Sequence, residues 1–320
     1  MNEKVLVLGG SYFVGRKIVE YLYYNDYDVT VLNRGTREVP VCGVKQILCD
    51  RNNLSAMKEA LKDEEFNSII DVSWQGLDWV KYACEAINFD TVKEFVFISS
   101  SAVYDIDVLE IPFKEEDSLG ENKYWTFYGK GKIDAEEYYI NFLRNKKTNL
   151  SIIRPPYIYG EYNYAQRESL IFRQIMEGMP VAIPNTNPQL QFIYTEDLAA
   201  VILYLIRNNC EKLCIFNVGN EQAVTSRDWV IACSEVVGME PRIIEVNYKK
   251  LGKEVRDFYP FFDYDNVLDV TKIKTLYHRE TNFIEGLNRA FDWFQLNREN
   301  IVFKKNVDKT LYELIAELSI

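Results

Sequence analysis

The chain of 320 residues carries a net charge of −11, and 48% of its residues are hydrophobic while 27% are charged. This composition is typical of a globular protein, long enough for one large core or for two lobes around a cleft. The negative charge disfavours nucleic-acid binding, because no basic patch offsets the repulsion of phosphate groups. The single histidine, His278, argues against a zinc or iron site, so we expect no metal.

The cysteines and the N-terminus indicate a reducing compartment. The cysteines form no CxxC pair and lack the dense spacing of a secreted disulfide scaffold, so we expect buried thiols. The six are Cys42, Cys49, Cys84, Cys210, Cys214 and Cys233. The first residues do not resemble a signal peptide, and no apolar run reaches the roughly 18 residues of a membrane span. We therefore expect a cytoplasmic protein without membrane contact.

Short apolar runs alternate with helical patterns over the first half of the chain. This alternation predicts an α/β fold with a doubly wound parallel sheet. The expected strands are Lys4–Leu8, Asp28–Leu32, Val44–Leu48, Ser68–Val72, Glu94–Ile98 and Leu150–Ile153. We expect a cofactor-binding domain over residues 1–155. Residues 156–320 are expected to form mainly a smaller α+β substrate lobe, with some segments returning to the sheet.

A glycine-rich stretch, "GGSYFVG" from Gly9 to Gly15, follows the first expected strand. The apolar spacing of Val14, Ile18 and Leu22 predicts a helix that starts within this stretch. Free N–H groups at the start of that helix, together with its positive end, would stabilise a pyrophosphate. The alternative is a glycine-containing turn without a ligand, because a partial glycine motif is a weak signal.

Polar residues follow the next strands. Asn33 and Arg34 end the second strand, where a ribose-contacting residue belongs, and Asp50 after the third is placed to meet the adenine edge. A carboxylate in place of Asn33 would select NAD by repelling a 2′-phosphate. Arg34 and Arg37 instead supply guanidinium groups suited to phosphate, which slightly favours NADP over NAD. The alternative is that both arginines are solvated or pair with Glu38.

A serine run, Ser99 to Ser101, ends the fifth expected strand, at the sheet edge where open α/β sheets hold their ligands. Tyr128 and Lys132 follow, four residues apart and so on one face of a helix, whereas Lys130 points elsewhere. A serine run can also be a neutral strand end, and the Tyr–Lys spacing alone proves nothing. The position of Tyr128 and Lys132 just after the strand that ends in these serines is what favours a catalytic pair.

Taken together, six segments resemble a known family. They are "GGSYFVG", "FISSSAVY", "YGKGK", "RPPYIYG", "QFIYTEDLA" and "FNVGNEQAVT". Their order and spacing are similar to those of the extended short-chain dehydrogenase/reductases, the NAD-dependent epimerase/dehydratase group, from Val5 to about Phe294. The opening resembles an atypical branch in which Tyr12 replaces the middle glycine. The resemblance implies an NAD(P)-binding Rossmann domain and a homodimer formed through the helices containing Trp79–Phe89 and Phe127–Leu143.

The resemblance also implies roles for individual residues. Tyr128 is the implied acid/base, Lys132 lowers its pKa and holds the nicotinamide ribose, and Ser100 hydrogen-bonds the reacting oxygen. A phenol titrates near pH ~10 and needs a neighbouring cation to act as a base near neutrality. The implied cofactor-binding residues are Gly9, Gly10, Tyr12, Phe13, Val14, Gly15, Asn33, Arg34, Asp50, Arg51, Ser73 and Lys132.

Departures from the family pattern reduce the number of candidate reactions. Related sugar dehydratases carry a carboxylate where Ser101 stands, and related carbon epimerases that act next to a ketone carry a cysteine and histidine pair. Neither feature is present at the matching positions, which leaves simple redox chemistry. The remaining reactions are C4-type epimerisation and carbonyl reduction.

The substrate site departs from the pattern as well. Nucleotide-sugar enzymes of the family often have asparagine where Tyr157 stands and usually arginine where Leu190 stands, so their standard substrate pose is in doubt here. Ser101, Tyr157, Arg167 and Arg256 are our substrate-contact candidates. The two arginines either replace the missing polar anchors or are solvated surface charges. The tyrosines of "RPPYIYGEYNY" either line a pocket or, for most of them, pack the lobe.

Three functions therefore remain. The first is NAD(P)-dependent hydride transfer on a sugar-type hydroxyl or carbonyl, nucleotide sugars included. The second is NADPH-dependent reduction of a carbonyl compound that is not a nucleotide. The third is a cofactor-binding regulator without turnover, since one fold hosts several functions. The intact Tyr128–Lys132 pair favours an enzyme that acts on a small molecule.

Overall fold

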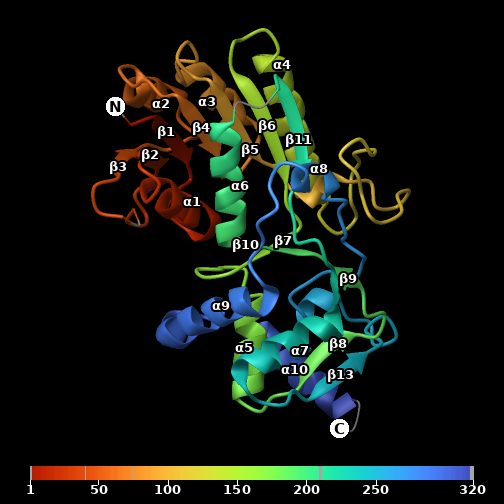
Figure 1. Ribbon diagram of the computed structural model, residues 1–320. Helices are drawn as coiled ribbons and strands as arrows, with labels where there is room; N and C mark the ends of the chain where they lie inside the picture. Colours follow the sequence, from red (N-terminus) through yellow and green to blue (C-terminus); the bar gives the residue numbers. More distant parts are fainter. Residues whose placement is uncertain (1, 40, 74, 209–210, 318–320) are drawn as a thin grey trace. The chain divides into compact units, whose positions relative to one another are not determined.

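A computed structural model describes residues 2–39, 41–73, 75–208 and 211–317. The chain divides into two units, both drawn in Figure 1. Unit 1 comprises Met1–Pro156, Thr195–Gly219 and Leu268–Arg279. Unit 2 comprises Tyr157–Tyr194, Asn220–Val267 and Glu280–Ile320.

Unit 1 is built on a seven-stranded parallel sheet in the order β11-β6-β5-β4-β1-β2-β3. Its strands are β1 (Lys4–Leu8), β2 (Asp28–Asn33), β3 (Lys45–Leu48), β4 (Ser68–Asp71), β5 (Glu94–Ile98), β6 (Asn149–Arg154) and β11 (Leu213–Asn217). The six strands predicted in the first half are confirmed, each within one residue at either end. Their near-continuous apolar sequences follow from burial on both faces of the sheet. The Rossmann-type α/β fold is thereby confirmed.

Helices cover both faces of this sheet (Figure 1). On one face lie α1 (Phe13–Tyr23) and α6 (Thr195–Arg207), packed against each other. On the other lie α2 (Leu54–Leu61), α3 (Leu77–Ala86) and α4 (Thr126–Leu143). A buried cluster joins this second layer to the sheet through Met57, Val80 and Tyr139, among others. The short α8 (Thr271–Lys274) packs beside β11.

Unit 2 holds short strand pairs and helices around an aromatic core. Its pairs are β7 (Tyr157–Tyr159) with β10 (Phe192–Tyr194), β8 (Val181–Pro184) with β13 (Ile243–Val246), and β9 (Gln189–Leu190) with β12 (Val224–Thr225). Its helices are α5 (Glu168–Met176), α7 (Ser226–Val237), α9 (Phe283–Asn297) and α10 (Lys305–Glu317). Phe192 stacks on Trp229 with ring centroids 4.1 Å apart, and Tyr159 meets the same indole edge-on. Tyr157 and Tyr159 are buried here, as packing predicts.

The cysteines only partly follow the prediction of buried thiols. Cys49, Cys84 and Cys233 are buried, but Cys42 is exposed because it lies in a turn before β3. Cys214 is half-buried, and Cys210 lies outside the described residues. None of the helices in the described ranges is both long enough and apolar enough to cross a bilayer.

Candidate active site

The glycine stretch forms a tight connection from β1 into α1. Gly9 has a φ of +97°, a conformation that glycine adopts far more readily than other residues, and a Cβ there would come within 2.5 Å of the Ser73 side chain. A Cβ on Gly15 would overlap the carbonyl oxygen of Gly9. Phe13 and Val14 begin the helix. The bare backbone at the start of α1 fits the close approach of a pyrophosphate.

The end of β2 carries an unsatisfied donor. Asn33 accepts hydrogen bonds from the Gly35 N–H and from Gln46 Nε2, both at 2.8 Å. Its own Nδ2 is buried and has no hydrogen-bond partner in the protein. Because buried donors are normally paired, this atom fits an oxygen of a bound ribose or phosphate. Asn33 therefore fits the predicted cofactor contact.

Two arginines follow this strand end. Arg34 is exposed, and the guanidinium carbon of Arg37 lies 3.6 Å from the ring centroid of Tyr12 in the glycine stretch. Neither arginine forms an ion pair with Glu38, a residue that the structure also describes. The alternative of an Arg–Glu38 pair is therefore not observed. Stacking on Tyr12 holds one positive charge beside the glycine stretch.

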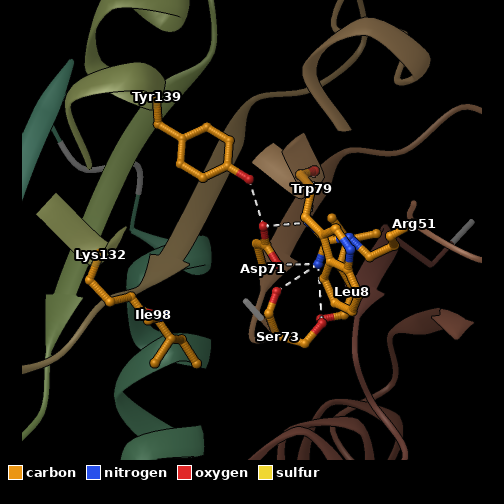
Figure 2. Close-up of polar contacts among 8 residues, drawn as sticks. All are labelled: Leu8, Arg51, Asp71, Ser73, Trp79, Ile98, Lys132 and Tyr139. Carbon is orange, nitrogen blue, oxygen red and sulfur yellow. Dashed lines mark hydrogen bonds and ion pairs between the residues drawn. The ribbon is translucent and has the colours of Figure 1, made fainter. Parts of the chain in front are cut away.

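Arg51 and Asp71 form a buried ion pair between the ends of β3 and β4 (Figure 2). The Arg51 Nη1 and Nη2 atoms lie 2.7 and 2.9 Å from the two carboxylate oxygens. Nη1 also donates to the Ser73 carbonyl and hydroxyl oxygens at 2.8 and 3.1 Å, and Nη2 donates to the Trp79 carbonyl. The terminal nitrogens of Arg51 are thus engaged within the protein. Arg51 reaches the glycine stretch through Ser73, which packs against Gly9.

Tyr139 of α4 completes this cluster, donating a 2.5 Å hydrogen bond to Asp71. Burial, and then the neighbouring Asp71 charge, raise the pKa of Tyr139 well above its usual value, so the phenol stays protonated as a donor. Sequence reasoning missed both Asp71 and Tyr139. The available signal was a carboxylate inside the otherwise apolar run of β4, because buried charges are normally paired.

Asp50, the predicted adenine contact, stays exposed after β3. Its carboxylate accepts hydrogen bonds from the Asn52 backbone N–H at 3.0 Å and from the Asn52 side chain at 3.1 Å. These contacts shape the turn that leads into α2. The exposed carboxylate remains accessible at the same sheet edge as Asn33.

Lys132 is buried, and Figure 2 shows it beside Ile98 at the end of β5. Its Nζ donates to the Ile98 carbonyl at 2.7 Å and lies 6.0 Å from the ring centroid of Tyr128, one helical turn earlier. Burial lowers the pKa of Lys132 to about 8, although the negative charges of Asp71 and Glu136 oppose that effect. The side chain is 3% exposed. A cation is thereby held on the Tyr128 side of α4. Lys130 points elsewhere, as predicted: it is exposed, and it forms an ion pair with Asp134.

The serines form the first turn after β5. Ser100 caps the short 3₁₀ helix η1 (Ser101–Val103) by accepting a hydrogen bond from the Ala102 N–H at 3.1 Å. Ser101 is buried, and its N–H donates to the Pro155 carbonyl at 2.9 Å. Gly129, which sequence reasoning missed, brings α4 against this turn, because a Cβ at Gly129 would overlap the Ala102 carbonyl oxygen. Tyr128 directly precedes Gly129 in this contact, and Ser100 lies two residues before Ala102.

The predicted substrate contacts of unit 2 lie around Tyr157. The Arg167 Nη1 donates to the Ile158 carbonyl at 2.9 Å, and its guanidinium carbon lies 5.1 Å from the Tyr157 ring centroid. Arg256 is half-buried and donates to the Pro260 carbonyl. Leu190, in the place of the arginine usual in the resembled family, is fully buried. Over the described ranges, no three His, Cys, Asp or Glu side chains are grouped so as to hold a metal ion.

Comparisons with known proteins extend this picture. The sequence model described as "NAD dependent epimerase/dehydratase family" matches residues 5–219. The chloroplast stem-loop binding protein of 41 kDa b from Arabidopsis thaliana is 28% identical over 98% of this chain and 84% of its own length. A putative UDP-glucose 4-epimerase of Methanocaldococcus jannaschii is 23% identical over 92% of this chain and 99% of its own.

Solved structures share the fold. A UDP-glucose 4-epimerase of Thermotoga maritima with UDP-glucose is 18% identical, with a TM-score of 0.75 over 92% of this chain and 99% of its own. A dTDP-glucose 4,6-dehydratase of Bacillus anthracis in complex with NAD is 17% identical, with a TM-score of 0.76 over 93% of this chain and 98% of its own.

Proposed function

The chain belongs to the NAD dependent epimerase/dehydratase family, and from this premise we propose that it transfers hydride to and from a sugar-type hydroxyl or carbonyl carbon. The bare backbone at Gly9, Gly10 and Gly15 would hold the pyrophosphate of a nicotinamide dinucleotide. Asn33 and Arg34 would contact its adenosine ribose, and Lys132 its nicotinamide ribose. When bound, this group supplies the hydride chemistry.

Residues of the chain itself accept and return the proton. Oxidation of an alcohol removes a hydride from carbon and a proton from the hydroxyl group, and we assign that proton to the Tyr128 phenolate oxygen. The charge of Lys132 favours the phenolate, because an adjacent cation lowers the pKa of an acid. Ser100 hydrogen-bonds the substrate oxygen. Reduction runs in the opposite sense, with Tyr128 returning the proton.

The burial of Lys132 is the observation that carries this proposal. Its Nζ is held by a single backbone carbonyl rather than by an ion pair, one turn from Tyr128. Burying a cation without a direct counter-ion destabilises a fold, so a structural role alone gives little reason for it. A strongly shifted pKa beside the ligand edge of a sheet is typical of functional sites.

A panel of substrates tests the proposal. The protein is loaded with oxidised or reduced cofactor and mixed with sugar nucleotides, free sugars, sugar phosphates and simple carbonyl compounds, while the absorbance of the reduced nicotinamide is followed. We expect at least one sugar-type compound either to change that absorbance or to be epimerised, as NMR of the products shows, in the wild type but not in Tyr128→Phe. If no compound does either, the hydride-transfer proposal fails.

The same assay separates epimerase from reductase. A C4-type epimerase oxidises and then reduces one substrate, so it inverts a carbon centre without net consumption of cofactor. A carbonyl reductase consumes one reduced cofactor for each product. Product analysis by NMR beside the absorbance trace therefore distinguishes the two reactions.

A regulator without turnover is the second candidate, favoured by similarity to the stem-loop binding protein. The net charge of −11 opposes RNA binding, because contacts with phosphate need local positive charge. A gel-shift titration with a stem-loop RNA at physiological salt tests this candidate. Saturable binding together with an inactive substrate panel would favour the regulator.

We also propose a homodimer through the helices containing Trp79–Phe89 and Phe127–Leu143. Phe127 on α4 is 81% exposed, which leaves an apolar side chain beside the candidate site uncovered in the single chain. Sedimentation at micromolar concentration tests this proposal. A monomer under those conditions would contradict it.

A further inference from the structure

The Lys132 ammonium group lies over the ring of Phe97, the residue that precedes Ile98 in β5. Its Nζ is 4.7 Å from the Phe97 ring centroid, compared with 6.0 Å from that of Tyr128. Phe97 is fully buried and Lys132 is nearly so. A cation is attracted to the electron-rich face of an aromatic ring, and the attraction is stronger where water is excluded. The Phe97 ring is therefore placed to stabilise the charged form of Lys132.

No carboxylate makes a direct contact of this kind. Among the residues that the structure describes, none lies within ion-pair distance of Lys132. Asp71 and Glu136, whose charges act on Lys132 from further away, are each paired with an arginine. The close partners of the buried ammonium group are thus the Ile98 carbonyl and the Phe97 ring.

The charge of Lys132 is sensitive to such a contact. Burial lowers the pKa of Lys132 to about 8. A further decrease of about one pH unit would leave a large share of the side chain neutral at pH 7. The proposed acid/base, Tyr128, needs a neighbouring cation to ionise near neutrality. A ring that favours the ammonium form therefore acts on Tyr128 through Lys132.

The Phe97 ring is itself held by Tyr139. Their ring centroids lie 5.1 Å apart, with the ring planes at 55°. Tyr139 is fully buried, and its hydroxyl donates to Asp71, which is also paired with Arg51. Close packing keeps buried side chains in one orientation. The buried cluster that packs against the glycine stretch thus also fixes the ring beside Lys132.

Phe95 offers an internal comparison. It lies two residues before Phe97 and therefore on the same face of β5. It is also fully buried and also packs on Tyr139, with ring centroids 4.6 Å apart. Over the described part of the chain, no cation lies over its ring. Burial and aromatic packing are common to both residues, whereas the contact with Lys132 is particular to Phe97.

We infer that Phe97 is a positioning residue: its ring face holds the Lys132 ammonium group beside the Ile98 carbonyl and keeps it charged next to Tyr128. The inference rests on the proposed function for the purpose of that charge. An ammonium group has three N–H donors. One donates to the Ile98 carbonyl and another side faces the ring, which leaves a donor for the nicotinamide ribose.

An NMR titration without cofactor or substrate tests the contact. The full chain with ¹³C-labelled lysine is titrated from about pH 6 to 10, and the signal missing from Lys132→Met is that of Lys132. Phe97 is replaced by mono-, di- and trifluorinated phenylalanine, which keeps the shape of the ring while removing electron density from its face. The same replacements at Phe95 are the matched controls. Thermal unfolding checks that each protein is folded.

We expect the pKa of Lys132 to fall stepwise with each fluorine added to Phe97, by about one pH unit for the trifluorinated ring. The same fluorine atoms on Phe95 should leave it unchanged. An unchanged pKa of Lys132 in the Phe97 series would overturn the inference. So would a decrease of equal size in the Phe95 series.

Turnover links the contact to the reaction once the substrate panel has yielded a substrate. With trifluorinated Phe97, kcat should match the wild type near pH 6, where Lys132 is charged in both proteins. It should fall about twofold at pH 7 and about fivefold at pH 8, where the variant has lost more of that charge. A decrease in kcat of the same size at every pH would indicate a structural effect and contradict the positioning role.

The two proposals fail separately. Turnover that depends on Tyr128, together with a pKa of Lys132 that ignores fluorination of Phe97, would leave the proposed function standing without this inference. A pKa of Lys132 that follows fluorination, in a protein that turns over no compound of the panel, would establish the contact and remove its proposed purpose.

Discussion

The Tyr139 hydroxyl lies 2.5 Å from an Asp71 carboxylate oxygen, joining α4 to the end of β4 across 68 residues of sequence. Arg51 bonds to the same carboxylate and to Ser73, which packs against Gly9. The buried polar cluster therefore packs against the glycine stretch through Ser73. We therefore expect fold stability and cofactor affinity to be linked through these contacts.

Arg51→Met is expected to lower the free energy of unfolding by about 3–5 kcal/mol, because it leaves the Asp71 charge buried without its partner. Urea denaturation measures this loss. Cofactor affinity should fall as well, since Ser73 loses its hydrogen bonds with Arg51.

The matched control for Arg51→Met removes both charges. In the double variant Arg51→Met, Asp71→Leu we expect most of the stability to return, because no buried charge remains. Tyr139→Phe should lose about 1–3 kcal/mol, the effect of one missing donor to a charged group. A single variant Arg51→Met as stable as the wild type would show that the pair does not stabilise the fold.

Tyr128→Phe is expected to abolish turnover while cofactor affinity stays within a few fold, because only the oxygen that transfers the proton is removed. Steady-state kinetics and cofactor titration measure the two effects. Tyr124→Phe, which removes a hydroxyl four residues earlier, is the control and should remain active. Turnover retained by Tyr128→Phe would exclude this phenol as the acid/base.

Lys132→Met is expected to change the pH dependence of stability. The folded pKa of Lys132, about 8, lies below that of an unfolded lysine, so between pH 8 and about 10 the folded state releases its proton first. The charged side chain then destabilises the wild type by roughly 3 kcal/mol at pH 7, and this penalty fades as the pH rises.

Urea denaturation of both proteins from pH 6 to 10 measures this difference. Near pH 7, Lys132→Met should have the higher free energy of unfolding, although loss of the hydrogen bond with Ile98 reduces the gain. The difference between the two proteins should shrink above pH 8. Because both proteins share every other titrating group, the difference reports Lys132 together with the groups whose pKa its charge shifts. A difference in stability that does not vary with pH would contradict the shifted pKa.

NADPH is expected to bind about ten- to a hundredfold tighter than NADH, because Arg34 offers a charge-assisted contact to the 2′-phosphate. Arg34→Ala should abolish this preference while leaving NADH affinity unchanged. Fluorescence titration of both cofactors measures it, and Arg37→Ala separates the contribution of the arginine stacked on Tyr12. Equal affinities in the wild type would show that Arg34 does not select the cofactor.

The sheet was predictable because its strands are buried on both faces, which leaves uninterrupted apolar runs such as "KVLVL" and "EFVFI". The family resemblance is confirmed by the match over residues 5–219. The partners of Arg51 were not predictable, since a buried ion pair joins distant residues and leaves no local periodicity. The same holds for Gly129, whose role depends on a carbonyl group from another segment. The roles of Tyr128, Lys132 and Ser100 stay predictions.

The contact between Gly129 and the Ala102 carbonyl has an evolutionary consequence. It fixes the approach of α4 to the turn after β5 by direct touch, so the length of the intervening segment does not set the position of Tyr128. We therefore expect that segment to tolerate insertions and deletions, and with them new substrate contacts, while Tyr128, the proposed acid/base, keeps its position relative to Ser100. On this hypothesis a single missing methyl group lets the substrate contacts change without moving the proposed catalytic residue.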